Sequence, residues 1–375
     1  MAAAERVVGR PGERGPLARA LRPVALVYEF ASLVRSTAYE TGYLRTVRVG
    51  RPVISVGNLT MGGTGKTPIV AMLAAFLTEQ NVRVAILTRG YGRRSKGRQV
   101  VHAGDANLEK ATADVVGDEP ALLARELDDV AIVVDADRVS AAEWAIAAAD
   151  ADVLLLDDGF QHLRLARDLN LLVLDATDPF GGGYLPPSGR LREPLQAIKR
   201  ADAVIVTRSD RPFDGDAITR VVTAARSAET PIYFAYHDIT GLRALGPLES
   251  SRTVASLRGK RVGVITAIGN PAVFVEDLEN VGMDVVSTSL FPDHHAFGQH
   301  DLDRAAVAAA TAGAEILLTT EKDAVKLERL QIKPNQLFAV RIAFRSEHEA
   351  LIKSMCMKAI LAYGRASTRG SGETS

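Results

Sequence analysis

The segment with the clearest chemical potential is Gly62-Gly-Thr-Gly-Lys-Thr67, a turn between an apolar run and a helix-like segment. Small residues there let backbone N–H groups converge on phosphate oxygens, while a lysine reaches the β- and γ-phosphates and a threonine hydroxyl binds Mg²⁺. Thr60 stands where the usual loop has glycine. We predict a nucleotide-binding loop in preference to a mere tight turn. The expected nucleotide contacts are Thr60, Met61, Gly62, Gly63, Thr64, Gly65, Lys66 and Thr67.

Two adjacent carboxylates follow a second apolar run. Val153-Leu-Leu-Leu156 predicts a buried strand, and Asp157 and Asp158 stand directly after it. Phosphate-loop enzymes commonly place an acidic residue at such a strand end, where it holds Mg²⁺ directly or through water. Alone, a strand-terminal Asp pair is more typical of a turn or cap. Downstream of a phosphate loop we favour the metal role, with Asp157 as the partner of Thr67.

Two further segments carry residues suited to acid–base chemistry. Gly117-Asp-Glu-Pro120 precedes a predicted helix, and a helix start favours acidic residues followed by proline for capping and dipole reasons alone. Phe291-Pro-Asp-His-His-Ala-Phe-Gly-Gln-His300 gathers three of the chain's seven histidines. Such a cluster suits either a metal site or a general base positioned by a carboxylate. The residues alone do not decide between these roles.

Alternating apolar and helix-like segments must position these residues. The phosphate loop lies between a predicted strand at Pro52–Val56 and a predicted helix at Ile69–Leu77. Further strands are predicted at Val82–Leu87, Val130–Val134, Val153–Leu156, Leu171–Leu174 and Ala203–Val206, and helices at Pro120–Leu127 and Ala141–Ala149. This alternation predicts an α/β fold with a P-loop NTPase-type parallel sheet, covered by helices, that binds ligands at the carboxyl ends of its strands.

A second, smaller α/β series follows an extended aromatic stretch at Pro231–Leu245. We therefore expect a phosphate-loop domain over residues 1–230 and a smaller α/β domain over residues 231–345, joined by an extended two-stranded linker. A closing helix at 346–363 is expected to pack back on the first domain. The small polar residues 364–375 predict a disordered tail.

Composition narrows the class of protein. The 375 residues are 47% hydrophobic and 24% charged, which is typical of globular domains, and the zero net charge gives no indication of a nucleic-acid partner. The single cysteine, Cys356, excludes an intramolecular disulfide framework and suits a reducing cytosol. No apolar run approaches the ~18–20 residues that span a bilayer, and we recognise no signal peptide.

Positive charge is nevertheless concentrated near the N-terminus. Residues 1–51 hold nine arginines and no lysine against four glutamates, a local balance of +5. Between Leu17 and Arg45, apolar residues are interspersed with arginines in the manner of a basic amphipathic helix. Such a helix either lies in a membrane interface or packs on its own domain with its arginines in solvent. The residues alone leave both alternatives open.

Taken together, these segments resemble the tetraacyldisaccharide 4′-kinase family, the lipid A 4′-kinases of Gram-negative bacteria. The resemblance extends from about Tyr28 to Leu327, and Thr60 fits this family's version of the loop. The motifs that carry it are Val56-Gly-Asn-Leu-Thr-Met-Gly-Gly-Thr-Gly-Lys-Thr-Pro68, Leu87-Thr-Arg-Gly-Tyr-Gly92, Gly117-Asp-Glu-Pro120, Asp157-Asp-Gly-Phe-Gln-His162, Leu191-Arg-Glu-Pro194, Ile268-Gly-Asn-Pro271, Phe291-Pro-Asp-His-His295 and Thr319-Thr-Glu-Lys-Asp-Ala-Val-Lys-Leu327.

The resemblance implies an ATP-dependent kinase that phosphorylates the 4′-hydroxyl of tetraacyldisaccharide 1-phosphate in lipid A (lipopolysaccharide) biosynthesis. It implies ATP and Mg²⁺ as cofactors and a peripheral location on the cytoplasmic face of the inner membrane, contacted by the N-terminal helix. In the family, residues matching Asp118 and His294 act together as a catalytic dyad, which gives Asp118 a role beyond capping. We expect these two residues on different domains of a monomeric protein.

The remaining site residues are assigned with the help of the same resemblance. We expect Mg²⁺ on Thr67, supported by Asp157 and Glu119. Contacts to the disaccharide or its 1-phosphate are assigned to residues that could equally form structural ion pairs. These are Asp158, His162, Arg190, Arg192 and Glu193.

Two other classes of phosphate-loop protein fit part of the pattern. A regulatory GTPase would use Thr207-Arg-Ser-Asp210 to read guanine, although arginine replaces the usual lysine. A partitioning-type membrane ATPase often carries lysine at the position of Met61. Turnover with GTP but not ATP would favour the first class, and ATP hydrolysis that needs no lipid acceptor would favour the second.

Overall fold

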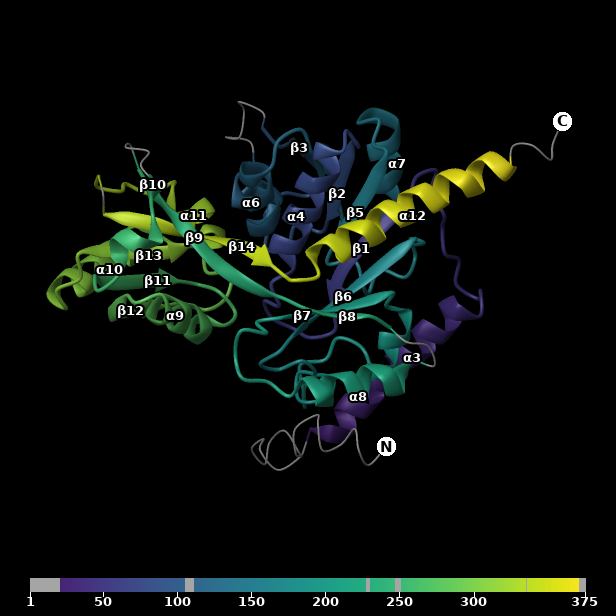
Figure 1. Ribbon diagram of the computed structural model, residues 1–375, viewed down its shortest axis with the longest axis horizontal. Helices are drawn as coiled ribbons and strands as arrows, with labels where there is room; N and C mark the ends of the chain where they lie inside the picture. The colour runs from purple at the N-terminus through teal and green to yellow at the C-terminus, as the bar shows by residue number, and fades with distance from the viewer. Residues whose placement is uncertain (1–20, 105–110, 227–229, 247–250, 335, 371–375) are drawn as a thin grey trace. The chain divides into compact units, whose positions relative to one another are not determined.

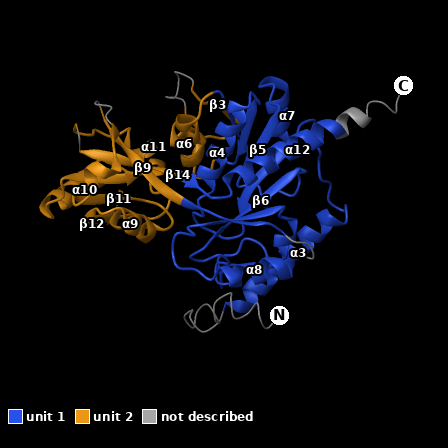
Figure 2. Cartoon of the chain, in the orientation of Figure 1, with its two compact units in different colours: residues 1–89, 129–236, 344–375 blue, residues 90–128, 237–343 orange. Residues whose placement is uncertain are grey.

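The computed structural model describes residues 21–104, 111–226, 230–246, 251–334 and 336–370, with side chains in the last range described up to residue 365. The chain divides into two compact units (Figure 2). Unit 1 comprises residues 1–89, 129–236 and 344–375, and unit 2 comprises residues 90–128 and 237–343. Each unit is therefore assembled from stretches that are distant in the sequence.

Unit 1 is built on a parallel sheet whose strands run in the order β4-β2-β5-β1-β6-β7-β8 (Figure 1). The strands are β1 Val53–Asn58, β2 Val84–Thr88, β4 Ala131–Val134, β5 Val153–Asp157, β6 Leu169–Asp175, β7 Ala203–Thr207 and β8 Ile232–Phe234. All residues of β1, β2, β4, β5, β6 and β7 are buried, as expected of parallel strands covered on both faces. The phosphate loop follows the carboxyl end of β1.

In the described part of unit 1, helices and the 3₁₀ helix η2 accompany this sheet. They are α3 Arg22–Glu40, α4 Lys66–Glu79, α7 Arg138–Ala148, η2 Leu195–Arg200, α8 Gly215–Ala225 and α12 Glu349–Gly370. Helix α4 packs against β1, β2 and β5, and α7 packs against β2 and β4. Apolar side chains of η2 and α8, including Ile198, Ile218 and Val222, form a buried cluster with β6 and β7. This architecture confirms the predicted parallel α/β sheet.

Unit 2 contains a second sheet, with the order β10-β9-β14-β13-β11-β12. Its strands are β9 Tyr236–Leu245, β10 Ser251–Arg252, β11 Arg261–Thr266, β12 Asp284–Leu290, β13 Ile316–Thr320 and β14 Leu337–Arg345, and β3 Gln99–His102 also belongs to the unit. The chain passes from one unit to the other within β9 and again within β14. The two-stranded linker stays a prediction.

The helices of unit 2 cover both faces of its sheet. They are α5 Ala113–Val116, α6 Asp118–Glu126, η3 Val254–Leu257, α9 Pro271–Asn280, α10 Gln299–Thr311 and α11 Glu321–Leu327. Successive residues of β11 point to opposite faces, so Val264 joins a buried cluster with α9, and Ile265 joins another with α10 and α11. Helix α6, from the stretch 90–128, packs against α11.

The structure corrects two expectations about organisation. Residues 90–128, expected in the first domain, belong to unit 2, because α6 packs against α11. Helix α12 continues through residues 364–370, where disorder was expected. Gly364 lies inside the helix and Gly370 is its last residue, and a single glycine inside a helix costs about 1 kcal/mol. The calls on residues 1–20 and 371–375 lie outside the described residues.

Candidate active site

The phosphate loop presents backbone N–H groups at the start of α4. Two of its glycines have positive φ angles, 112° at Gly62 and 74° at Gly65, a conformation that side chains rarely allow. Gly65 is the N-cap of α4, and no side chain caps the helix there. A Cβ added at Gly63 would have no neighbour within 4 Å. The loop therefore offers uncapped N–H groups and open space, which fits an anion such as a phosphate.

Contacts from β1 and from the end of β7 hold this loop in shape. Asn58 Nδ2 donates to Thr64 Oγ1 at 3.0 Å, and Thr207 Oγ1 donates to the Thr64 carbonyl oxygen at 2.9 Å. The Arg208 guanidinium donates to the Gly63 carbonyl oxygen at 3.2 Å and also pairs with Asp175. Thr207 and Arg208, the residues that a GTPase would use toward guanine, thus support the loop here.

Thr60 does not need the conformational freedom of glycine. It forms an antiparallel bridge with Leu191, and its side chain is buried. The next residue continues the pairing, because Met61 N donates to the Arg190 carbonyl oxygen at 2.7 Å. A β-branched residue suits this extended conformation. The departure from the usual loop pattern therefore has a local structural cause.

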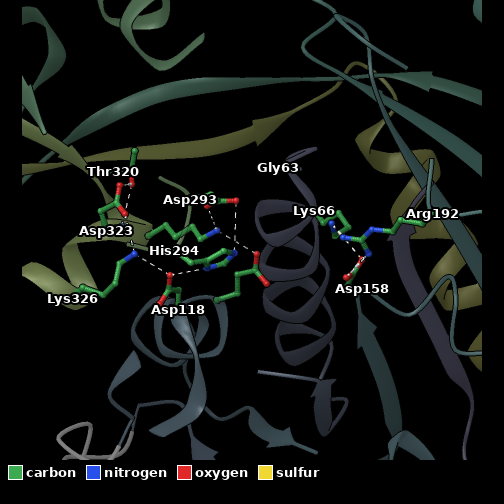
Figure 3. Close-up of polar contacts among 12 residues, drawn as sticks. Gly63, Lys66, Asp118, Asp158, Arg192, Asp293, His294, Thr320, Asp323 and Lys326 are labelled. Atoms are coloured by element: carbon green, nitrogen blue, oxygen red, sulfur yellow. Dashed lines mark hydrogen bonds and ion pairs between the residues drawn. The ribbon is translucent and has the colours of Figure 1, made fainter. Parts of the chain in front are cut away.

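Lys66 is held at the start of α4 by one carboxylate. Its Nζ atom lies 3.4 Å from Asp158 Oδ1, while Arg192 Nη1 donates to both oxygens of Asp158 at 2.8 and 2.6 Å (Figure 3). Burial would raise the pKa of Asp158, but the charges of Lys66 and Arg192 outweigh it and lower that pKa to about 2. Asp158 is thus a carboxylate at neutral pH. It forms an ion pair with Lys66, the lysine that is predicted to bind phosphates.

Thr67 and Asp157 fit the magnesium role by position and by chemistry. Thr67 lies in the first turn of α4, and Asp157 ends β5, which pairs in parallel with β1 in the register Val56 to Asp157. Both residues therefore lie near the same edge of the sheet. A hydroxyl and a carboxylate are oxygen ligands of the kind Mg²⁺ prefers. Among the described residues there is no group of three or more His, Cys, Asp or Glu side chains that could hold a metal ion.

Of the other residues assigned to the disaccharide, two form ion pairs within unit 1 and the third does not. Arg190 forms an ion pair with Asp178, and Glu193 is buried against Arg200. His162 is half-buried, and burial lowers its pKa to about 4, so its ring is neutral at pH 7. Its Nε2 atom is buried without a hydrogen-bond partner among the described residues. These observations agree with structural ion pairs for Arg190 and Glu193, while His162 retains an unused polar atom.

Asp118 and His294 lie together in unit 2, not on different domains as expected. Asp118 begins α6, and His294 follows β12; their Oδ2 and Nδ1 atoms are 3.1 Å apart (Figure 3). His294 has a φ of 62°, an uncommon angle for a residue with a side chain, and its backbone N–H donates to the Ala267 carbonyl oxygen at 3.2 Å. Backbone strain of this kind is concentrated at functional sites.

The charges around Asp118 determine which atom of His294 can accept a proton. Burial raises the pKa of Asp118, but the hydrogen bond with His294 and the charge of Lys326 outweigh it, so this pKa lies below its usual range. An ionised carboxylate only accepts hydrogen bonds, so Nδ1 must donate the proton it carries. In the neutral imidazole Nε2 is then the acceptor, as in a histidine base oriented by an aspartate.

Glu119 forms part of a second ion cluster in unit 2. Lys322 Nζ lies 3.8 Å from Glu119 Oε1 and 3.5 Å from Asp293 Oδ1. Burial lowers the pKa of Lys322, but the two carboxylates more than offset this and the pKa is raised. Asp293 Oδ2 is also 3.8 Å from His294 Nε2. The assignment of Glu119 to magnesium stays a prediction.

Comparison with known proteins places this set of residues in a family. A family model for tetraacyldisaccharide-1-P 4′-kinase matches residues 17–359. The chain belongs to that family. A tetraacyldisaccharide 4′-kinase of Anaeromyxobacter sp. (strain K) is 42% identical over 324 residues, which cover 85% of this chain and 84% of the relative. One from Geobacter metallireducens is 40% identical over 307 residues, or 82% of this chain and 88% of that protein.

A solved structure extends the match to three dimensions. The chain resembles LpxK from Aquifex aeolicus, crystallised in complex with ATP, with 32% identity and a TM-score of 0.71. The match covers 92% of this chain and 99% of that protein. Membership of this kinase family confirms the resemblance seen in the motifs, and the GTPase and partitioning ATPase alternatives are not favoured.

Sequence reasoning gave no role to several residues that contact the dyad or the loop. In unit 2 Lys326 and Tyr91 contact the dyad, and Asp323 holds Lys326. Arg208 in unit 1, considered only for guanine in the GTPase alternative, contacts the loop. Lys326 and Asp323 both lie in the motif Thr319–Leu327, and a signal was present there. Charged residues at i and i+3 directly after an apolar strand are expected on one face of a short helix, close to the strand's carboxyl end.

Proposed function

We propose that this chain transfers the γ-phosphoryl group of ATP to the 4′-hydroxyl of tetraacyldisaccharide 1-phosphate. The observation that carries the proposal is the bond between His294 Nδ1 and Asp118 Oδ2, at 3.1 Å. A nucleotide hydrolase needs to position only water, whereas a kinase must activate an acceptor hydroxyl. A histidine oriented by a carboxylate is suited to that task.

In the proposed reaction unit 1 binds the nucleotide and unit 2 activates the acceptor. The N–H groups of Gly62–Gly65 and the Lys66 ammonium bind the ATP phosphates, with Lys66 exchanging Asp158 for a phosphate oxygen. His294 Nε2 takes the proton of the 4′-hydroxyl as its oxygen forms the bond to the γ-phosphorus. The bond from that phosphorus to the β–γ bridging oxygen breaks, and ADP leaves. Phosphoryl transfer depends mainly on such positioning and charge stabilisation.

We assign the magnesium role to Thr67 and Asp157, which supply hydroxyl and carboxylate oxygens at one edge of the sheet of unit 1. When bound, Mg²⁺ would neutralise charge on the β- and γ-phosphates. Glu119 remains a further candidate. For the disaccharide and its 1-phosphate, His162 is the assignment that the contacts favour, because its Nε2 atom has no hydrogen-bond partner among the described residues. Arg190 and Glu193 have ion-pair partners, as do Arg192 and Asp158, which pair with each other.

The membrane contact is assigned to α3. Ala25 is the one residue of α3 that is buried, while Val27 and Phe30 are 70% and 69% exposed. Further exposed apolar residues of the helix are Val24, Leu26, Tyr28, Leu33 and Val34. An apolar face left in solvent favours membrane contact over packing on the domain. Among the described residues no helix is long and apolar enough to cross a bilayer. We assign α3 to the cytoplasmic face of the inner membrane, as the family resemblance implies.

The membrane assignment is tested by co-sedimentation with vesicles containing anionic phospholipid. Val27→Glu and Phe30→Glu should each reduce the bound fraction, because a charge would enter the apolar layer. Val307→Glu is the matched control, since Val307 is 66% exposed but lies on α10. Equal vesicle binding by all three variants would contradict the assignment of α3 to membrane contact.

The function itself is tested by phosphate transfer from γ-³²P-labelled ATP to tetraacyldisaccharide 1-phosphate in mixed micelles. Labelled lipid should form with ATP and the wild-type protein, and GTP should be a poor donor. Release of labelled phosphate without labelled lipid would indicate an ATPase and contradict the proposal. Transfer that requires GTP would instead revive the GTPase alternative.

A further inference from the structure

A buried lysine next to Asp118 has no role in the reaction as described so far. Lys326, on α11, is 3% exposed, and its Nζ atom lies 3.0 Å from Asp118 Oδ2 and 3.3 Å from Asp323 Oδ1. The ammonium also lies 5.4 Å from the centroid of the Phe297 ring. A charge removed from water in this way is costly unless its partners are well placed. The positions of those partners are therefore informative.

Asp323 is the fixed end of this arrangement. Its side chain is fully buried, and its Oδ2 atom accepts hydrogen bonds from Thr266 Oγ1 at 2.7 Å, the Ala267 N–H at 2.9 Å and Thr320 Oγ1 at 3.0 Å. Thr266 ends β11, and Thr320 ends β13, so two neighbouring strands hold one carboxylate oxygen. Three donors on Oδ2 fix the carboxylate, and Oδ1 is left facing Lys326.

The contacts of Asp323 reach His294 by two routes. Through side chains, Asp323 holds Lys326, and Lys326 and the His294 ring share Asp118 Oδ2 (Figure 3). Through the backbone, the Ala267 N–H binds Asp323, while the Ala267 carbonyl oxygen accepts the His294 N–H at 3.2 Å. The network thus constrains both the ring of His294 and the backbone that carries it at positive φ.

Stability alone is a poor explanation for such a network. Buried ion pairs are often replaced by apolar side chains of similar size with no loss of stability, because desolvation offsets their attraction. What an ion network supplies, and apolar packing cannot, is a fixed orientation for a particular oxygen. A misplacement of about 1 Å can cost on the order of 10²-fold in rate.

We propose that Lys326 and Asp323 are positioning residues for phosphoryl transfer, in which Asp323 fixes Lys326 and Lys326 fixes the Asp118 carboxylate that orients His294. The proposal rests on the proposed function, since it takes the Asp118–His294 pair as the group that activates the acceptor. Neither residue touches the reacting atoms. Their loss should therefore lower kcat while the KM for ATP, which is bound in unit 1, stays unchanged.

The test compares Lys326→Met, Lys326→Arg and Asp323→Asn with the wild-type full-length protein in the ³²P-transfer assay. Lys326→Met should reduce kcat about 10- to 100-fold at unchanged KM for ATP. In an Asp118→Ala background it should reduce kcat no further, because the lysine acts through that carboxylate. Lys260→Met is the matched control, since Lys260 makes an exposed ion pair with Glu315 in the same unit, and it should leave kcat unchanged.

Chemical rescue separates orientation from folding. Lys326→Cys in a Cys356→Ala background, alkylated with 2-bromoethylamine after unfolding and then refolded, carries an ammonium at nearly the same place and should regain most of the lost kcat. Unfolding is needed because position 326 is buried, and replacing Cys356, the single native cysteine, leaves one thiol to react. If Lys326→Met does not fold, this variant and Lys326→Arg still decide the question.

Three outcomes would overturn the proposal. They are wild-type kcat in a folded Lys326→Met protein, recovery of thermal stability without recovery of kcat after aminoethylation, and an undiminished effect of Lys326→Met in the Asp118→Ala background. An inactive wild-type protein in the same assay would instead refute the proposed function. The two failures are therefore distinguishable within one experiment.

Discussion

The charge clusters of units 1 and 2 differ in how firmly their ions are held. In unit 1 Lys66 has one carboxylate at 3.4 Å, and the side chain of that residue, Asp158, is 32% exposed. In unit 2 Lys326 lies between two buried carboxylates, one of them anchored by three hydrogen bonds. We therefore expect Lys66 to exchange its partner for a phosphate oxygen and Lys326 to keep both of its partners. On this account the cluster of unit 1 binds a charged ligand, and the cluster of unit 2 orients a carboxylate.

The largest expected loss of kcat comes from removing the Asp118–His294 pair in unit 2, and it tests this comparison most strongly. His294→Ala and Asp118→Asn should each lower kcat on the order of 10²–10⁴-fold, because a positioned base contributes that much. The double variant should be no worse than the poorer single variant, since residues that act as a unit are not additive. Steady-state ³²P transfer measures this, and His300→Ala, an exposed histidine nearby in sequence, serves as the control. Fully multiplicative losses would show that the two residues act separately.

Removal of the exchangeable lysine in unit 1 should have the next largest effect. Lys66→Met should lower kcat on the order of 10²–10³-fold, as expected for the loss of one charge that stabilises the transferring phosphoryl group. It should also weaken ATP binding, which isothermal titration measures. Arg83→Met, which removes an exposed ion pair with Asp150 and Asp152 in the same unit, should change neither quantity. Wild-type ATP affinity in Lys66→Met would contradict the binding role.

Glu193 tests whether an ion pair of unit 1 serves the substrate or the fold. Because it is buried against Arg200, Glu193→Gln should lower the free energy of unfolding by about 1–3 kcal/mol and leave the KM for the lipid acceptor unchanged. Urea unfolding and acceptor kinetics provide the two measurements. A raised acceptor KM at unchanged stability would restore Glu193 to the substrate site.

The smallest expected effect is a dependence of stability on pH, which tests whether the pKa of Asp158 is lowered. Its pKa is about 2 in the folded protein and about 3.9 in unfolded chains, so its ionised form stabilises the fold above pH 4. That contribution is lost as the pH falls from about 4 toward 2. The stability difference between wild type and Asp158→Asn, measured by urea unfolding, should therefore be constant from pH 7 to 5 and shrink below pH 4. A difference that is independent of pH would mean that the pKa of Asp158 is not lowered.

Local patterns in the sequence predicted much of the fold and of the phosphate site. The strand, loop and helix around Lys66 are contiguous, so their spacing encodes their geometry, and β1 and α4 lie where they were expected. The apolar runs at Val153–Leu156 and Ala203–Val206 likewise correspond to β5 and β7. Buried parallel strands are recognisable because both of their faces are apolar.

The environment of Asp118 could not be predicted from the residues around it. Its partners are His294 and Lys326, which are 176 and 208 residues away in the chain. Nothing in Gly117–Pro120 beyond a helix start indicates that residues 90–128 join unit 2, so residue chemistry alone favoured a cap. The resemblance to a family supplied the dyad, but only the packing of α6 against α11 gives it a buried lysine.

The central claim is a division of labour, in which unit 1 binds ATP and the Asp118–His294 pair of unit 2 activates the acceptor. It is tested most directly by measuring ATP affinity and ³²P transfer on the same preparations of wild type, Lys66→Met and His294→Ala. The account predicts that His294→Ala binds ATP as wild type does but fails to transfer phosphate, while Lys66→Met loses both. Loss of ATP binding in His294→Ala in proportion to its loss of transfer would contradict the account.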